Sequence, residues 1–199
     1  YLGTVAVLWT AYLVRRAWRT PGLWRDWGFR VDNVKASLPF YLGISALIFA
    51  STNHTQHGNT ILTTPETLDP RKKVRMKLND PPNPDSLYAV SKLFGENIGK
   101  LYSQRHGLEF IGLRIGWIVA PDDPTIMRGT PAEDYLRAMF LSHRDCVQAH
   151  CRALEVEARY LLAYVVSDNG RRVFDLEETR RTLGFAPQDD AETYFAKVQ

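Results

Sequence analysis

The fold is decided by residues 86–119, which read SLYAVSKLFGENIGKLYSQRHGLEFIGLRIGWIV. Apolar residues recur at steps of three and four in the first part, which predicts an amphipathic helix over Ser86–His106. Asp85 or Ser86 suits its N-cap, and Gly107 is the residue type that most often ends a helix. The second part, Leu108–Val119, is largely apolar and predicts a strand. The apolar stripe of the helix consists of Leu87, Val90, Phe94, Ile98 and Leu101.

An apolar segment upstream, Ile44–Ala50 (ISALIFA), predicts a fully buried strand whose carboxyl end opens into a polar loop, Ser51-Thr52-Asn53-His54. Strand, loop, helix and strand in this order indicate a parallel α/β sheet. Such sheets bind ligands at the carboxyl ends of their strands, where the polar loop lies. Downstream we expect a helix over Ala132–Leu154, a strand over Tyr160–Val166 and a short helix over Leu176–Leu183.

The composition is that of a globular protein. The chain has 199 residues, of which 45% are hydrophobic and 24% charged, and its net charge is +3. This excludes a disordered or fibrous chain, and the charge is too small to indicate nucleic acid as a partner. We therefore expect a single domain over residues 1–199 and no nucleic-acid partner.

The two cysteines, Cys146 and Cys151, lie five positions apart within one predicted helix. This spacing does not suit disulfide geometry. A reducing compartment fits best, and we expect the protein to be cytoplasmic.

The amino-terminal segment Tyr1–Val14 is nearly all apolar and is followed by Arg15, Arg16 and Arg19. It is shorter than the roughly 20 residues that a membrane span needs, so a buried element of a globular core is the favoured interpretation. A truncated membrane anchor, which would tether the protein, or a signal remnant is the alternative, although signal peptides carry their positive charges before the apolar run. A sequence anomaly is a third interpretation.

A long loop over Gly58–Pro84 carries five prolines and a cluster of basic residues. Loops of this length are commonly functional or mobile. The cluster has no interleaved aromatic residues, which favours a solvated loop over contact with a nucleic acid or a phosphorylated ligand. Its members are Arg71, Lys72, Lys73, Arg75 and Lys77.

The sharpest chemical pattern is Tyr88-Ala-Val-Ser-Lys92, together with Thr52 at the end of the preceding strand. An ammonium group one helical turn from a phenol stabilises the phenolate, which makes the tyrosine a usable acid and base. A Thr52 hydroxyl could then hold a substrate oxygen while Tyr88 transfers a proton. This division of labour suits the oxidation of an alcohol or the reduction of a carbonyl.

Tyr88 and Lys92 share a narrow helix face with Gly95 and Gly99. Because glycine has no side chain, we expect another part of the molecule to approach the helix backbone closely there.

With these residues in this order, the chain resembles the extended short-chain dehydrogenase/reductase family, of the NAD-dependent epimerase/dehydratase type. The resemblance covers about Ile44 to Ala191 and is closest to the branch of uronate dehydrogenases and NAD-dependent sugar dehydrogenases. It implies a Rossmann-like parallel sheet flanked by helices. The strings that carry it are Leu47–His54, Pro84–Glu96, Leu113–Gly116, Leu141–Asp145 and Val166–Asn169.

The resemblance implies a role for each matching residue. Tyr88 is the general acid and base, Lys92 stabilises its phenolate and binds the nicotinamide ribose, and Thr52 takes the catalytic Ser/Thr position. The implied cofactor is NAD or NADP, and the implied substrate is a hydroxyl of a sugar or sugar acid. Ala50 and Ile115 would line the nicotinamide site, and Asn53, His54 and Arg137 would face the substrate.

The amino-terminal region departs from the family pattern. Family members begin with a strand and a Gly-x-x-Gly-x-x-Gly loop that holds the pyrophosphate, and the 13 glycines here never fall at that spacing. Asn33 resembles a family asparagine, but the segment from there to Thr52 is short and contains Pro39. We therefore expect residues 1–43 to be atypical or incomplete and residues 44–191 to be family-like.

Two groups of residues carry side chains that can bind a metal ion. One helix face carries His143, Cys146, His150 and Cys151, but structural zinc sites draw their ligands from separated pairs. His54 and His57 form a short His-x-x-His, for which contact with substrate or solvent is favoured. We predict no metal.

Three alternatives stay open at this stage. A nucleotide-sugar epimerase or dehydratase would use the same tyrosine and lysine with a tightly held NAD. A catalytically impaired family member without a complete cofactor site would bind a sugar without turnover. We also expect pairing of two copies through the helix that bears Tyr88, as the family resemblance implies.

Overall fold

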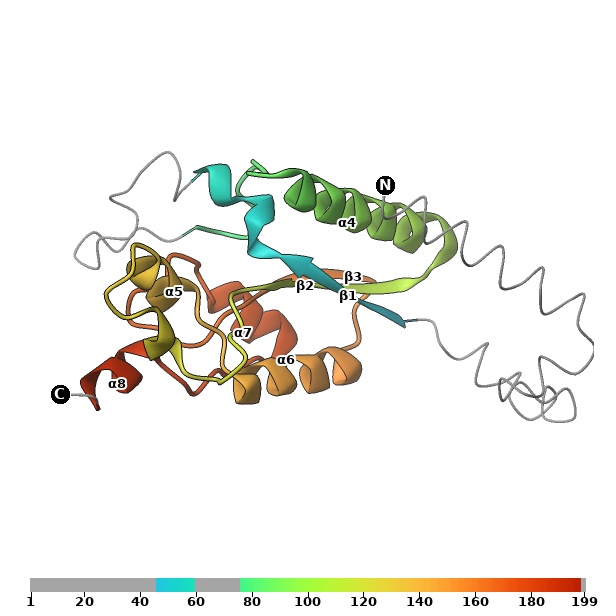
Figure 1. Ribbon diagram of the computed structural model, residues 1–199. Coiled ribbons are helices and arrows are strands. Elements are labelled where there is room, and N and C mark those ends of the chain that lie inside the picture. The colour runs from blue at the N-terminus through green and yellow to red at the C-terminus, as the bar shows by residue number, and fades with distance from the viewer. Residues whose placement is uncertain (1–45, 60–75, 198–199) are drawn as a thin grey trace, which may run out of the picture. The chain divides into compact units, whose positions relative to one another are not determined.

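The computed structural model describes residues 46–59 and 76–197, all of which belong to one compact unit, Ser45–Gln199 (Figure 1). The apolar segment Tyr1–Val14, the atypical region up to residue 43 and four of the five basic loop residues lie outside the described residues. None of the helices in the described part has the length and apolar character needed to cross a bilayer. The single-domain interpretation of residues 1–199 stays a prediction.

The described part is built on a three-stranded parallel sheet in the order β1-β2-β3. The strands are β1 (Ala46–Thr52), β2 (Glu109–Ile115) and β3 (Tyr160–Val165). Thr52 pairs with Ile115, and Ile115 pairs with Val165, so the three strands end side by side. This confirms the predicted parallel α/β sheet and brings the carboxyl ends of its strands to one edge.

Strand β1 is less buried than the sequence predicts. Leu47 is 46% exposed and Ala50 is also exposed. The prediction of a fully buried strand over Ile44–Ala50 is wrong in this respect because, within the described residues, β1 pairs with β2 alone. The strand also extends to Thr52, so the polar residues Ser51 and Thr52 lie in the sheet.

Helix α4 (Leu87–His106) has the predicted bounds. The Ser86 hydroxyl accepts a hydrogen bond from the backbone of Ala89 and caps its first turn. Gly107 ends it in the left-handed conformation with φ of 69°, which glycine adopts without steric cost.

Helix α4 packs against the sheet through its glycine face. A Cβ atom added at Gly95 would lie 2.4 Å from the Phe49 ring, and one at Gly99 would lie 2.1 Å from the Phe110 ring. The predicted close approach is therefore confirmed, and the two rings on β1 and β2 make it. The absence of side chains at these positions brings the helix, and with it Tyr88 and Lys92, close to the end of β1.

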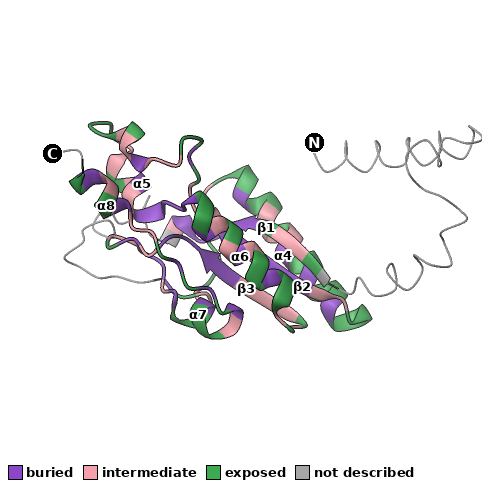
Figure 2. Cartoon of the chain, turned by 90° about the horizontal axis from the view of Figure 1, so that it is seen from below, coloured by how far each residue is buried: buried purple, intermediate pink, exposed green. Residues whose placement is uncertain are grey.

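The apolar stripe of α4 faces away from the sheet. Figure 2 shows the buried stretches of the sheet and the exposed stretches of the helices around it. Phe94, for example, is 66% exposed, whereas Ala89, Gly99 and Ser103 on the other side are buried. The stripe predicted from the spacing exists, but small residues form the packing face. The exposed members are Leu87, Val90, Phe94, Ile98 and Leu101.

Helices α6 (His143–Glu155) and α7 (Glu177–Leu183) cover the opposite face of the sheet (Figure 1). Ala149 and Ala153 of α6 and Leu183 of α7 join the sheet residues in one buried apolar cluster. The sheet contributes Ile111, Leu113, Ala163 and Val165 to it. Helices on both faces of a parallel sheet are the Rossmann-like arrangement that the resemblance implies.

The single helix predicted over Ala132–Leu154 is wrong. The structure has two helices there, α5 (Glu133–Met139) and α6, separated by Phe140, which forms a parallel bridge with Trp117. The Ser142 side chain caps α6, which starts a new helix instead of continuing the first. The remaining short elements are η2 (Asn53–Thr55), η3 (His57–Asn59), η5 (Pro124–Met127) and α8 (Ala191–Ala196).

Candidate active site

A cavity of about 760 Å³ opens where β1 and β2 end. Its walls come from the turn after β1, the start of α4, the segment after β2 and the start of α5. This is the sheet edge where open α/β folds place their ligands. The cavity is lined by Thr52, Asn53, His54, His57, Asp85, Tyr88, Gly116, Trp117, Pro131, Ala132 and Tyr135.

Thr52 is the last residue of β1 and caps the short helix η2. Its hydroxyl oxygen accepts a hydrogen bond of 3.3 Å from the His54 backbone N–H, and its carbonyl accepts one of 3.0 Å from the Thr55 hydroxyl. Thr52 is itself buried to 4% exposure, so these bonds hold its side chain in place at the cavity wall. The hydroxyl proton remains able to donate to a bound molecule.

Tyr88 and Lys92 lie one turn apart on α4, as the spacing requires. Tyr88 is 55% exposed and lines the cavity. The Lys92 ammonium lies 5.6 Å from the centre of the Tyr88 ring and donates a hydrogen bond of 2.7 Å to the Ala50 carbonyl. The helix therefore supplies a phenol to the cavity and places a positive charge beside it.

A buried network fixes the end of β1 to β2 and α4. The Arg114 guanidinium donates hydrogen bonds of 2.9 and 2.8 Å to the two carboxylate oxygens of Glu96. Ser51 also donates to Glu96, and Gln56 accepts from both Arg114 and the Tyr164 hydroxyl. Burial alone would lower the pKa of Arg114, but its bonds to Glu96 outweigh that and raise it. Both charges are therefore paired, and the strand that carries Thr52 is held rigidly.

The far wall of the cavity is a cluster around the Asp85 carboxylate. One oxygen of Asp85 lies 2.6 Å from His54 Nδ1 and 3.2 Å from His57 Nδ1. The Tyr135 hydroxyl lies 3.3 Å from His54 Nε2 and 3.4 Å from His57 Nδ1. Partial burial would raise the pKa of the Asp85 carboxyl, but hydrogen bonds from His54 and Ser86 lower it overall. Burial, reinforced by the charge of a protonated His54, lowers the pKa of His57 to about 4.

Among the described residues, His54, His57 and Asp85 are the group whose geometry could hold a metal ion, since their donor atoms all lie within 4.8 Å of one another. Each of these donors already takes part in the hydrogen bonds given above. The predicted helix-face candidates have other contacts. His143 Nε2 lies 3.1 Å from the Val119 carbonyl oxygen, and His150 Nδ1 lies 2.8 Å from the Cys146 carbonyl oxygen. Both cysteines are unpaired, as their spacing predicted.

The structure brings together most of the site residues named from the sequence. Thr52, Asn53, His54 and Tyr88 line the cavity, although the Asn53 amide donates to the Met139 sulfur. Three others, Lys92, Ala50 and Ile115, are not among the lining residues. Lys92 and Ala50 are joined to each other, and Ile115 pairs with Thr52 across the strands.

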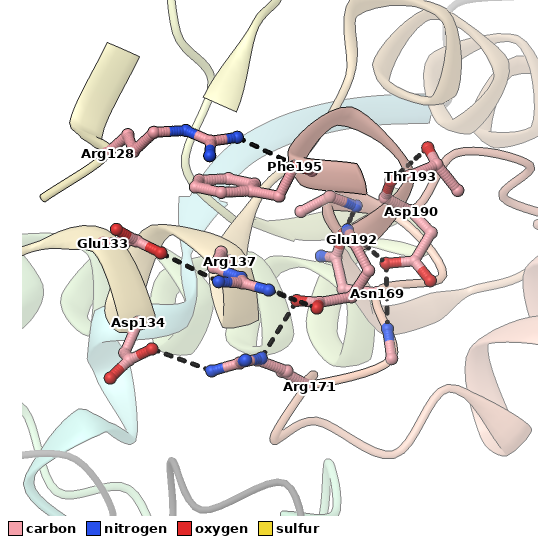
Figure 3. Close-up of polar contacts among 12 residues, drawn as sticks. Arg128, Glu133, Asp134, Arg137, Asn169, Arg171, Asp190, Glu192, Thr193 and Phe195 are labelled. Atoms are coloured by element: carbon pink, nitrogen blue, oxygen red, sulfur yellow. Dashed lines mark hydrogen bonds and ion pairs between the residues drawn. The ribbon is translucent and has the colours of Figure 1, made fainter. Parts of the chain in front are cut away.

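Arg137 is not among the residues that line the cavity. Figure 3 shows its side chain between Glu133 and Glu192. Its guanidinium donates to Glu133 at 2.8 Å and makes a two-pronged contact with Glu192, and it stacks over the Phe195 ring at 4.3 Å. The hydrogen bonds to Glu192 and Glu133 raise its pKa. The Arg137 side chain thus links α5 to α8, and its role as a substrate-facing residue stays a prediction.

Sequence reasoning missed the roles of Asp85, Tyr135 and Trp117 in the cavity. The sequence indicates Asp85 only as a candidate helix cap and His57 only as part of a histidine pair. Tyr135 lies two positions from Arg137, and the expected continuous helix gave no reason to prefer one over the other. The signal that could have found Asp85 is its place just before α4, where the chain leading into the helix must pass the end of β1.

A parallel sheet with a tyrosine and a lysine one turn apart on α4, and a hydroxyl at the end of the neighbouring strand, is a Rossmann-like arrangement with a phenol, an ammonium group and an alcohol near one ligand-binding edge. Residues 36–139, just over half of the chain, match the model of the NAD dependent epimerase/dehydratase family. The chain belongs to this family.

Individual relatives narrow the comparison. L-arabinose 1-dehydrogenase (NAD(P)(+)) of Haloferax volcanii is 41% identical over 158 residues, which are 75% of this chain and 61% of that protein. Uronate dehydrogenase of Pseudomonas putida is 31% identical over 160 residues, 79% of this chain and 51% of that protein. The crystal structure of glucuronic acid dehydrogenase from Chromohalobacter salexigens superposes with a TM-score of 0.61 at 28% identity, covering 80% of this chain and 53% of that one. The chain thus spans about half to three fifths of the length of these relatives.

Proposed function

We propose that the protein oxidises a hydroxyl group of a sugar or sugar acid, with NAD or NADP as the hydride acceptor. The observation that carries this proposal is that Thr52 and Tyr88 line one cavity while Lys92 lies one turn from Tyr88. The dehydrogenase relatives support the same chemistry, since their names give a pentose and a uronate as substrates.

In this mechanism Thr52 and Tyr88 divide the work. The Thr52 hydroxyl donates to the substrate oxygen and orients it, and the Tyr88 phenolate takes the hydroxyl proton as the carbonyl forms. The Lys92 ammonium places a positive charge one turn from Tyr88. The buried pair of Glu96 and Arg114 keeps the end of β1 at a fixed distance from α4.

The described residues fit the nicotinamide end of the cofactor. Lys92 and Tyr88 present a donor and a hydroxyl beside the open end of β1, where Ala50 is exposed, and Ile115 continues this edge on β2. The bound dinucleotide would supply a hydride acceptor there. The sequence contains no Gly-x-x-Gly-x-x-Gly loop for the pyrophosphate, so we assign only the nicotinamide end to these residues.

We infer that two copies pair through α4. The exposed apolar stripe on this helix supports the inference, because a contiguous apolar surface is costly to leave in water. A cytoplasmic location, predicted from the cysteines, accords with their unpaired state.

Calorimetric titration of the 199-residue chain with NAD and with NADP tests the proposal. We expect micromolar binding of one of them, lost in Lys92→Ala and kept in Lys100→Ala. Lys100 is the matched control because it is an exposed lysine on the same helix, beside Tyr160 and not beside Tyr88. Absence of binding to the folded parent would contradict the proposal. NAD that copurifies with the chain would favour the epimerase or dehydratase alternative.

A further inference from the structure

We propose that Asp85 and Tyr135 make the cavity selective for a neutral sugar over a sugar acid or sugar phosphate. The inference rests on the proposed function and names its substrate class. It concerns a wall of the cavity that takes no part in the proton transfer of Thr52 and Tyr88.

The Asp85 carboxylate determines the charge of this wall. Asp85 accepts hydrogen bonds from both histidines through one oxygen and from the Ser86 hydroxyl, at 2.8 Å, through the other. A carboxylate with three donors is favoured in its ionised form, which agrees with its lowered pKa. Asp85 therefore contributes a negative charge to this wall.

Asp85 determines which nitrogen of each imidazole ring carries the proton. A neutral histidine has one donor and one acceptor nitrogen, and a carboxylate next to Nδ1 makes that nitrogen the donor. His54 Nε2 is then an acceptor that faces the Tyr135 hydroxyl. Burial, followed by the charge of Asp85, raises the pKa of Tyr135, so its hydroxyl stays protonated. With its proton directed to His54 Nε2, the Tyr135 hydroxyl can accept a hydrogen bond from a hydroxyl group of a sugar.

The positively charged side chains near the cavity are engaged elsewhere. Asp85 is the one acidic or basic residue besides the histidines among those that line the cavity in the described part, and none of these is a lysine or an arginine. Arg137 is paired with Glu133 and Glu192, and Arg114 is paired with Glu96. The Lys92 ammonium, which lies beside Tyr88 and is not part of the lining, donates to the Ala50 carbonyl. A substrate carboxylate or phosphate would thus lose water and face Asp85 without a compensating cation from this lining.

Part of the cavity lining is apolar. The rings of Trp117 and Tyr135 lie 5.3 Å apart and form an aromatic side of the cavity next to Pro131 and Ala132. An aromatic surface with a few fixed polar groups suits a neutral polyol, which has both C–H faces and hydroxyl edges.

The test uses pairs of sugars that differ only at C6, which is a CH2OH group in one member and a carboxylate in the other: D-galactose with D-galacturonate, and D-glucose with D-glucuronate. Binding to the full chain is followed by ligand-observed NMR, which needs no turnover, and kcat/KM is measured with NAD and NADP. In the pair of sugars that binds more tightly, we expect the neutral member to have an affinity and a kcat/KM about tenfold or more above those of the uronate. This is the size expected for one unfavourable contact between like charges.

Asp85→Asn removes the charge and is expected to narrow this preference several-fold, whereas Asp85→Glu keeps the charge and should keep the preference. Asp134→Asn is the control, since Asp134 lies on α5 beside Tyr135 but is 66% exposed and pairs with Arg171. If circular dichroism shows that Asp85→Asn does not fold, the preference of the parent for the neutral sugar or the uronate still tests the inference.

The outcomes separate this inference from the proposed function. A preference for the uronate member, by binding or by turnover, overturns the inference and leaves the proposed function standing. Preferred binding of the neutral member without turnover supports the inference and contradicts the proposed function. Binding of no member of either pair overturns both.

Discussion

The Lys92 ammonium donates a hydrogen bond of 2.7 Å to the carbonyl of Ala50, two residues before Thr52. This bond ties the second turn of α4 to the carboxyl end of β1. Because Tyr88 lies one turn from Lys92 and Thr52 ends β1, the same bond fixes the two proposed reacting groups relative to each other. A lysine at this position is thus both a charge beside the phenol and a link between two elements.

The buried ion pair below the site should be required for stability. Glu96→Gln removes the negative charge and leaves the buried guanidinium of Arg114 without a counter-charge, which should lower the free energy of unfolding by about 3 kcal/mol or more. Urea denaturation followed by circular dichroism measures this. Glu155→Gln, in an exposed pair with Arg152, should change stability by less than about 1 kcal/mol. Equal effects of the two substitutions would contradict the role assigned to the buried network.

The close packing of α4 on the sheet predicts a steric effect at Gly99. In Gly99→Ala the new methyl group would meet the buried Phe110 ring, so we expect a loss of about 1–3 kcal/mol. Gly170→Ala is the control, because the nearest atoms to its Cβ would lie at an ordinary contact distance of 3.6 Å. The midpoints of thermal unfolding compare them. An unchanged midpoint in Gly99→Ala would show that the helix does not approach the sheet this closely.

Acid should destabilise the protein through His57, whose side chain is 2% exposed. Its pKa is lowered from 6.5 to about 4, so the unfolded chain binds more protons than the folded protein between these values. The free energy of unfolding therefore falls as the pH falls through this window, by about 3 kcal/mol in total.

Urea denaturation at a series of pH values measures this dependence. It should be flatter in His57→Gln and unchanged in His106→Gln, because His106 is exposed at the end of α4. A parent whose stability is constant between pH 6.5 and 4 would contradict the buried, neutral state of His57.

Pairing through α4 predicts that Phe94→Asp yields monomers, because it places a charge in the exposed apolar stripe. Light scattering coupled to gel filtration measures the mass. Val147→Asp is the control, as Val147 is exposed to a similar extent on α6. A monomeric parent would remove the predicted dimer, and a dimeric Phe94→Asp protein would place the interface elsewhere.

Local patterns were sufficient to predict the strand-helix-strand unit and its orientation. The bounds of α4 follow from Ser86 and Gly107, whose conformations are set within a few residues of chain. The parallel order of β1 and β2 follows because a helix must connect them. Thr52, Tyr88 and Lys92 could be placed near one another for the same reason.

What the sequence did not predict depends on contacts distant along the chain. Periodicity located the apolar stripe of α4, but the packing face was decided by Phe49 and Phe110 meeting its two glycines. The break between α5 and α6 depends on the bridge of Phe140 to Trp117. The partners of Arg137 lie in part on α8, 55 positions away, and no local signal reveals them.

The two carboxyl-proximal strings of the family resemblance hold each other in the structure. The Ser142 backbone donates to the Ser167 hydroxyl at 3.0 Å, and that hydroxyl donates to Asp145 at 2.7 Å. The Asn169 amide donates to the Phe140 carbonyl at 2.8 Å. These strings therefore join α6 to the segment after β3, a structural role that the sequence did not assign.

The most direct test of the central claim is the oxidation of D-galactose and D-galacturonate by the purified chain, followed by nicotinamide absorbance, in the parent, Tyr88→Phe and Tyr102→Phe. Tyr102 is the matched control, an exposed tyrosine on the same helix that lies beside His106 and not in the cavity. The account predicts that Tyr88→Phe lowers kcat/KM by about 100-fold or more while Tyr102→Phe retains the activity of the parent. Equal activity of the parent and Tyr88→Phe would contradict the assignment of Tyr88 as the acid and base of this site.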